Sequence, residues 1–285
     1  MVSRNDYDPS LVPLILGQAA EVVRALSFAG GHLTIIGGLV PQLLVPVVET
    51  GLAGHVGTLD LDMCMSVTML GGDVGEYENL EDGLKKAGFE VMREDSKPVS
   101  WRWRRSNTKL VVEFLCPVPA DGSKRAGQLH RPGGPIAGKL SALVLDAGDL
   151  IAADTRVVKR KVELTKGALE FEFRVAGPLS WLVAKTDALE RRDKNKDAYD
   201  IVWLCECWPG GQAALAVELS ASPMFSVPKA ANGMSRLQAA FADRDQIGPK
   251  QYAEFMVEDD RERSALRAVG AVAALFAELE VPSRA

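Results

Sequence analysis

Two aspartates one residue apart give the chain its clearest candidate for chemistry. Asp60 and Asp62 lie in the stretch GTLDLDMCM, whose alternation is typical of a strand. Residues two apart on a strand share a face, so both carboxylates point the same way while the residues between them point into a core. Two carboxylates held side by side repel each other, and a divalent cation such as Mg²⁺ would remove that repulsion. The structural alternative is an edge strand with a solvated acidic face.

A third carboxylate stands in the middle of a second apolar stretch, KLVVEFLCPV. This residue is Glu113, and a carboxylate is seldom found at such a position without compensation. Arg102 or Arg104, across a predicted hairpin, would compensate it structurally, whereas a shared metal would compensate it functionally. If the Glu113 strand lies beside the Asp60 strand, three carboxylates converge in the layout of a two-metal phosphoryl or nucleotidyl transfer centre.

A pair of glycines ends the apolar stretch HLTII and precedes a predicted helix over residues 39–50. Glycines between a strand and a helix let backbone N–H groups approach a phosphate closely. Gly37 and Gly38 are therefore candidate phosphate-binding residues, and the structural alternative is a tight turn. Pro46 is expected to kink this helix or to end it early.

Composition narrows the class of protein. The chain has 285 residues, is 47% apolar and 25% charged, and carries a net charge of −5, so a polyanion partner would need a local basic surface. Four scattered cysteines and three dispersed histidines predict reduced thiols and no zinc cluster. The sequence shows no secretion leader and no apolar run long enough to span a bilayer, which predicts a cytoplasmic protein without a membrane partner. It also contains no Walker A, G-x-G-x-x-G, G-x-S-x-G or H-E-x-x-H pattern.

The predicted elements divide the chain near residue 177. Strands dominate the first part, including the hairpin over 99–105 and 109–118 and an alternating stretch over 168–176. After Pro178 the pattern becomes helical, and helices are expected over residues 179–192, 196–207, 211–220, 233–243 and about 260–280. We therefore expect an α/β (α+β) domain over 1–177 and a helical domain over 178–285.

The order of these motifs resembles the nucleotidyltransferase superfamily, which has the polymerase-β-like fold. The matching segments are Ile36-Gly37-Gly38, Leu59-Asp60-Leu61-Asp62 and Val112-Glu113-Phe114. The resemblance implies a core with a mixed sheet, an NTP co-substrate and two Mg²⁺ ions held by Asp60, Asp62 and Glu113. It also implies that Gly37, Gly38 and Thr58 contribute to nucleotide binding.

A second segment, VAKTDALERRDKNKDAYDIVWL, resembles the helical signature of AbiEii-type nucleotidyltransferases, the toxins of type IV toxin–antitoxin systems. The matching positions include Lys185, Arg192, Asp197 and Asp200. The resemblance implies that Lys185 contacts phosphate, and that Asp197 and Asp200 orient Lys185 or Arg192 or face the acceptor. It further implies an RNA acceptor such as tRNA and a cognate antitoxin protein. The structural alternative is a pair of amphipathic helices with solvated charges.

The chain departs from the family pattern at two positions. Leu39 stands where the family often has Ser or Thr, and Val56 stands where it often has Arg, with His55 beside it. Phosphate binding is then weaker or uses other groups, and loss of catalysis is one consistent outcome.

Three basic clusters are candidates for binding RNA. They are Arg102-Arg104-Arg105 with Trp101 and Trp103, Arg156-Lys159-Arg160-Lys161, and Arg191-Arg192-Lys194-Lys196. The two tryptophans are expected to lie in the core rather than at the surface. Three functions stay open: an RNA-modifying nucleotidyltransferase, a nucleotidyltransferase acting on an aminoglycoside-like small molecule, and a non-catalytic relative that binds a nucleotide or a protein.

Overall fold

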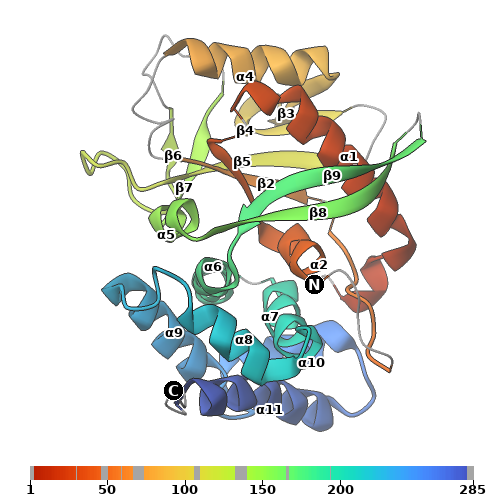
Figure 1. The fold of residues 1–285 in the computed structure, drawn as a ribbon, viewed down its shortest axis with the longest axis vertical. Coiled ribbons are helices and arrows are strands. Elements are labelled where there is room, and N and C mark those ends of the chain that lie inside the picture. The colour runs from red at the N-terminus through yellow and green to blue at the C-terminus, as the bar shows by residue number, and fades with distance from the viewer. Residues whose placement is uncertain are drawn as a thin grey trace. The chain divides into compact units, whose positions relative to one another are not determined.

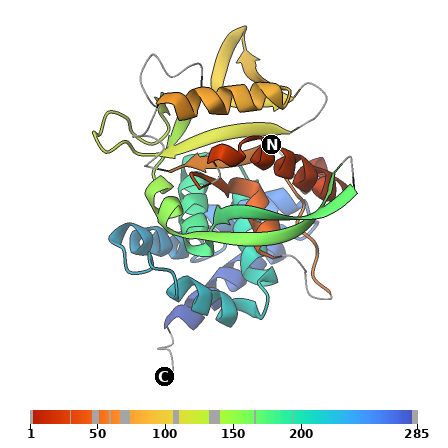
Figure 2. The ribbon, with the colours of Figure 1, turned by 45° about the horizontal axis from the view of Figure 1, so that its top comes forward.

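A computed structural model describes residues 3–29, 31–45, 51–58, 60–66, 74–105, 110–131, 140–164, 167–192 and 194–280 (Figures 1 and 2). The chain divides into two compact units. One unit comprises residues 10–43 and 58–176, which we call the sheet unit. The other comprises residues 1–9, 44–57 and 177–285, which we call the helical unit. Each unit is described by itself.

One mixed sheet forms the centre of the sheet unit. Its described strands are β1 (Leu33–Ile36), β2 (Asp60–Met65), β3 (Phe89–Glu94), β4 (Lys97–Arg105), β5 (Val111–Pro117), β6 (Leu129–His130), β7 (Ala142–Leu145), β8 (Thr155–Leu164) and β9 (Gly167–Ala176). The strand order is β3-β4-β5-β2-β1-β9-β8, and β7 pairs with β5 and β6. The β2–β5 and β1–β9 pairs are parallel, whereas β1–β2, β4–β5 and β8–β9 are antiparallel. The expected α/β (α+β) class with a mixed sheet is confirmed.

Helices α1 (Val12–Ala25), α4 (Val74–Lys86) and α5 (Gly148–Ala153) pack on strands of this sheet. The short helix α2 (Val40–Leu44) comes after β1 in the chain. Helix α1 packs on β8, and a Cβ on Gly17 would lie 2.3 Å from the Glu163 carbonyl oxygen of that strand. Gly17 therefore permits the helix backbone to approach the strand backbone. Residues 46–50 of the expected helix over 39–50, including the predicted kink at Pro46, lie outside the described residues.

The helical unit contains six helices among its described residues. They are α6 (Pro178–Arg191), α7 (Lys196–Cys207), α8 (Gly211–Ser220), α9 (Pro228–Ala240), α10 (Ile247–Met256) and α11 (Arg261–Glu280). Proline at the first position starts both α6 and α9, as its fixed φ favours. Two short segments, 1–9 and 44–57, complete this unit. Within the described residues, no helix is long and apolar enough to cross a membrane.

Candidate functional site

The predicted carboxylates lie on neighbouring strands of the sheet unit. In the parallel β2–β5 pair, Asp62 is the direct partner of Glu113. On the other side of β2, Asp62 is the partner of Ile36, the residue before Gly37. Directly paired residues share a face of the sheet, so Asp62 and Glu113 lie side by side. Asp60, two residues before Asp62, lies on the same face.

An arginine extends this row by one strand. Arg102 on β4 is the direct partner of Glu113, and its Nε donates a hydrogen bond of 2.9 Å to Glu113 Oε1. Its Nη1 donates another of 2.9 Å to Glu94 Oε1. We call the four paired residues Ile36, Asp62, Glu113 and Arg102 the carboxylate row. The row gives Glu113 the arginine expected as its structural compensation on one side, and it places a second carboxylate, Asp62, on the other.

Gly37 brings backbone against the same carboxylate. Its φ of +73° lies in the left-handed region, where side chains are disfavoured. A Cβ on Gly37 would lie 1.7 Å from Asp62 Oδ2, so no residue with a side chain fits without displacing the carboxylate. Glycine is required here for two independent reasons. The turn predicted to hold phosphate thus lies directly beside the aspartate predicted to hold metal.

Thr58 has a structural contact at the start of the same strand. Its Oγ1 accepts a hydrogen bond of 3.3 Å from the backbone N–H of Asp60. The hydroxyl therefore orients the residue that begins β2. Leu39, at the first departure from the family pattern, is fully buried and packs in the core. It contributes no hydroxyl to the turn after Gly38.

The carboxylates of Asp60, Asp62 and Glu113 are the type of ligand that suits a hard cation, because Mg²⁺ prefers carboxylate oxygens. In the described parts of the chain, however, no three His, Cys, Asp or Glu side chains are gathered as a metal cluster would require. The hydrogen bond from Arg102 accounts for one Glu113 oxygen. Asp60, Asp62 and Glu113 thus fit the chemistry of the metal, and their role as its ligands stays a prediction.

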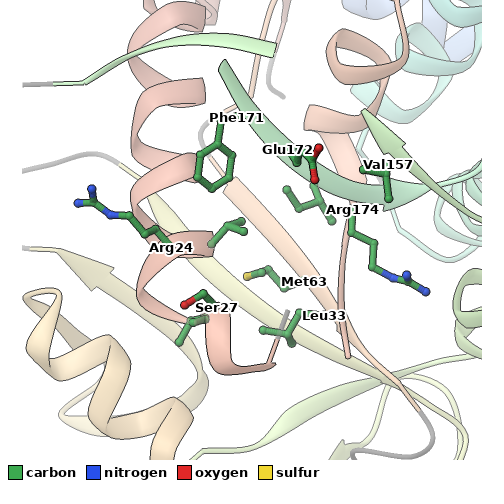
Figure 3. A pocket seen from close by; sticks show the side chains of 11 residues that line it. Arg24, Ser27, Leu33, Met63, Val157, Phe171, Glu172 and Arg174 are labelled. Carbon is green, nitrogen blue, oxygen red and sulfur yellow. The ribbon is translucent and has the colours of Figure 1, made fainter. Parts of the chain in front are cut away.

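The opposite face of β1 and β2 carries a hollow of about 360 Å³ (Figure 3). Ile35 and Met63, which are paired with each other, line it together with residues of α1, β8 and β9. Figure 3 shows Phe171 turned into the hollow, whereas Arg24 and Arg174 extend away from it on either side. Since Met63 alternates with Asp62 along β2, the hollow and the carboxylates lie on opposite faces.

The other predicted residues belong to the helical unit, where they bind one another. Lys185 Nζ donates hydrogen bonds of 2.7 Å to both Asp197 Oδ1 and Asp200 Oδ2. Arg192 forms a bidentate pair with Asp197, with distances of 2.8 Å and 2.9 Å. Their expected contacts with phosphate or acceptor stay predictions. In this structure Lys185, Asp197 and Asp200 are buried, so their alternative as solvated helix charges is wrong.

Two further residues, which the motifs did not single out as site residues, complete this buried network around Asp200. Lys196 Nζ and His55 Nε2 contact Asp200 Oδ1 at 2.6 Å and 3.0 Å. His55 Nδ1 accepts a hydrogen bond from the Gly57 N–H, so Nε2 carries the proton that is donated to Asp200. His55 and Asp200 are 145 residues apart. No local sequence signal could have joined them.

The charges in the network shift one another's pKa values. Burial would raise the pKa of Asp200, but Lys185 and Lys196 outweigh burial and lower it. Burial would lower the pKa of Lys185, but Asp197 and Asp200 raise it instead. Burial also lowers the pKa of His55 to about 4, against a smaller opposing effect of the hydrogen bond to Asp200. His55 is therefore neutral near pH 7, and the aspartates and Lys185 are charged.

The predicted basic clusters are partly neutralised. Lys159 lies 3.3 Å from Glu172, and Arg160 donates a hydrogen bond to the Leu43 carbonyl. Trp103 is fully buried, which confirms the expected core position for that tryptophan. Trp101 is half-buried beneath the Arg102 guanidinium, 5.5 Å from its ring centroid. Some residues of the first two clusters are thus held within the sheet unit, whereas Arg104 and Lys161 are exposed.

No protein-family model matches the chain, and no curated protein matches it. Three solved structures are distantly similar. JHP933 from Helicobacter pylori has 15% identity over 92% of each chain, with a TM-score of 0.38. An antigenic nucleotidyltransferase-like protein from Paracoccidioides brasiliensis has 14% identity over 82% of this chain and 89% of that chain, with a TM-score of 0.41. A second H. pylori protein, a provisionally named nucleotidyltransferase, has 13% identity over 92% of this chain and 95% of that chain, with a TM-score of 0.36. Likenesses this distant assign neither an activity nor site residues.

Proposed function

We propose that the protein is a metal-dependent nucleotidyltransferase. It transfers a nucleoside monophosphate from an NTP to an acceptor hydroxyl and releases pyrophosphate. Asp60, Asp62 and Glu113 would hold Mg²⁺, and the backbone of Gly37 and Gly38 would lie against the phosphates. The proposal rests on the residues of this chain and on the order of their motifs.

The observation that carries the proposal is the contact between the Gly37 turn and Asp62. A Cβ at Gly37 would lie 1.7 Å from Asp62 Oδ2. A glycine turn lets a phosphate approach the backbone, and a carboxylate beside it can share a cation with that phosphate. A structural turn alone would need the positive φ, but it would not need to meet the paired carboxylates.

The residues of the site would act mainly by position and charge. The bound Mg²⁺ would supply neutralisation of the triphosphate charge. Asp60 and Asp62, fixed on one strand face, would orient the metal against the Gly37 turn. Glu113, beside Asp62, would join the metal ligands and help to activate an acceptor hydroxyl once its oxygen is released by Arg102. The buried network of Lys185, Asp197 and Asp200 would position α6 and α7, and its contact with phosphate or acceptor stays a prediction.

The finer proposal is an AbiEii-like toxin that modifies RNA, such as tRNA, and has a cognate antitoxin. Its support beyond the motif is the third basic cluster. Arg191 and Lys194 are exposed, and neither forms an ion pair with a described residue. A surface of this kind suits a phosphate backbone. An aminoglycoside-like acceptor is the alternative for the same chemistry.

Two observations favour a second candidate, a non-catalytic relative that binds a nucleotide or a protein. Arg102 holds Glu113, and the core position of Leu39 leaves no hydroxyl after the glycines. In such a protein the row would be a structural ion pair.

The test is incubation with Mg²⁺, each labelled NTP, and either total tRNA or an aminoglycoside. We expect label on RNA, and we expect Asp60→Asn and Asp62→Asn to lower its rate by about 100-fold or more while the fold is kept. Asp82→Asn, on the exposed face of α4, is the matched control and should keep the wild-type rate. Label found only on the aminoglycoside would show that the acceptor is a small molecule rather than RNA. No transfer, with NTP still raising the melting temperature, would favour the second candidate. Wild-type turnover in Asp62→Asn would refute the site.

A further inference from the structure

We propose that Arg102 is the counter-ion of the two carboxylates in the carboxylate row, Asp62 and Glu113, and that it competes with the metal for binding to Glu113. This inference rests on the proposed function, because it takes Asp60, Asp62 and Glu113 as the metal ligands. It adds a regulating residue that none of the motifs contains.

The position of Arg102 supports the competition. Its Nε lies 2.9 Å from Glu113 Oε1, and the side chains of Arg102 and Glu113 are 25% and 15% exposed. The partner strands hold Glu113 between Asp62 and Arg102 on one face. The guanidinium therefore offsets the repulsion between the two neighbouring carboxylates when no cation lies there. Two cations, the guanidinium and a metal, would repel each other across the same oxygen.

A second carboxylate makes an exchange feasible. Arg102 Nη1 already donates a hydrogen bond of 2.9 Å to Glu94 Oε1. Glu94 ends β3 and its side chain is 60% exposed, so it can follow the guanidinium at little cost in packing. If Glu113 is taken by a metal, Arg102 keeps one ionic partner rather than becoming a part-buried, unpaired charge.

Arg102 thus has two states in this proposal. Without metal, Arg102 bridges Glu113 and Glu94. With metal, Glu113 turns to the cation and Arg102 remains with Glu94.

The experiment measures Mn²⁺ binding by electron paramagnetic resonance and melting temperature without metal, both on the full chain. We expect Arg102→Gln to lower the Mn²⁺ dissociation constant by roughly fivefold, which is the effect of losing one ion pair near the surface. The same substitution should lower the melting temperature measured without metal. Glu94→Gln should raise the dissociation constant, because Arg102 would then stay on Glu113. That effect should vanish in the double variant with Arg102→Gln.

Further variants serve as controls. Arg131→Gln removes an equal charge from an exposed position of the same unit and should leave Mn²⁺ binding unchanged. Glu94→Gln tests the competition if Arg102→Gln does not fold, since it keeps Arg102 and should still raise the Mn²⁺ dissociation constant. Arg102→Lys keeps the charge, and its Mn²⁺ affinity should stay near that of the wild type.

The outcomes separate this inference from the proposed function. If Asp62→Asn abolishes Mn²⁺ binding but Arg102→Gln and Glu94→Gln leave it unchanged, the competition is refuted and the metal site stands. If the wild type binds no Mn²⁺, or if Asp62→Asn binds it equally well, the proposed metal site is refuted, and this inference fails with it.

Discussion

Gly37 holds its backbone in the left-handed region, against the carboxylate of Asp62 on the neighbouring strand. The sequence predicted a glycine turn and, separately, a paired-aspartate strand. Their direct contact depends on the antiparallel register that places Ile36 opposite Asp62. At this scale the residue types were readable from the chain, whereas the register between strands was not.

We expect Gly37→Ala to lower both stability and metal binding. The positive φ alone should cost about 1 kcal/mol in the free energy of unfolding, and the clash should turn Asp62 out of the row. Gly122→Ala is the matched control, because Gly122 also has a positive φ, of +66°, but has open space around its Cβ position. Urea unfolding and Mn²⁺ titration would be measured for both variants. Equal Mn²⁺ binding in the two would contradict the contact between Gly37 and Asp62.

Arg102 provides one of the two compensations expected for Glu113, and the other, a shared metal, stays a prediction. The sequence allowed either an arginine or a metal as the compensation for Glu113. The structure places Arg102 on the same face as Asp62, rather than on the opposite side of the sheet. The arginine pair therefore does not remove Glu113 from the other carboxylates.

Among the elements, most of those with strong periodicity were predicted. The antiparallel β4–β5 pair, β9, and helices α6, α7, α8 and α11 appear within a few residues of their expected bounds. Elements that were missed carry weaker local signals, and they include β3, β8, α5 and α10. β8 is an edge strand with the basic run Lys159-Arg160-Lys161 at its centre, so it lacks an apolar run. α10 begins IGP, which resembles a turn although proline is tolerated in the first turn of a helix.

The contact between α1 and β8 is the element-scale feature that we expect to be most sensitive to substitution. Gly17→Ala would place a Cβ 2.3 Å from the backbone oxygen of Glu163, so the helix must shift away from the strand. We expect a loss of about 1–3 kcal/mol in the free energy of unfolding. Gly270→Ala, in α11 with nothing within 4 Å of the Cβ position, should be neutral or stabilising by up to about 1 kcal/mol. Urea denaturation compares the two. A neutral Gly17→Ala would mean that α1 packs less closely than described.

At the scale of the whole molecule, the helical unit is discontinuous in sequence. Residues 1–9 and 44–57 belong with residues 177–285, whereas the sequence suggested continuous domains over 1–177 and 178–285. The segment 44–57 is joined to α7 by three hydrogen bonds, from Val56 to Tyr199, from Trp203 to Ala53, and between His55 and Asp200. The expected boundary describes the order of elements along the chain but not which segments pack together.

The buried His55 in this contact between segment 44–57 and α7 predicts that the stability of the protein depends on pH. Burial, the largest cause, holds the pKa of folded His55 at about 4, below its ordinary value of 6.5. As pH falls from 6.5 to 4, the unfolded chain takes up the proton first, so the folded state loses stability, by about 3 kcal/mol at most. The lowered pKa values of Asp197 and Asp200 act in the same direction, but only near and below pH 3.8.

His55→Gln tests this, since glutamine can still donate to Asp200 but does not titrate. Urea unfolding at several pH values should give a shallower slope for this variant than for the wild type between pH 6.5 and 4. His130, whose pKa burial also lowers, contributes equally to both proteins and cancels in the difference. Parallel slopes would show that His55 is not buried as a neutral side chain.

The sequence by itself determined the fold class, most periodic elements and the residue types of the candidate site, because periodicity and turn chemistry are local properties of the chain. Tertiary structure alone decided which residues meet. The register between strands brings Asp62, Glu113 and Arg102 into one row. The packing of segment 44–57 on α7 brings His55 to Asp200. Such pairings depend on the packing of segments far apart in sequence, and many pairings are compatible with the same local pattern.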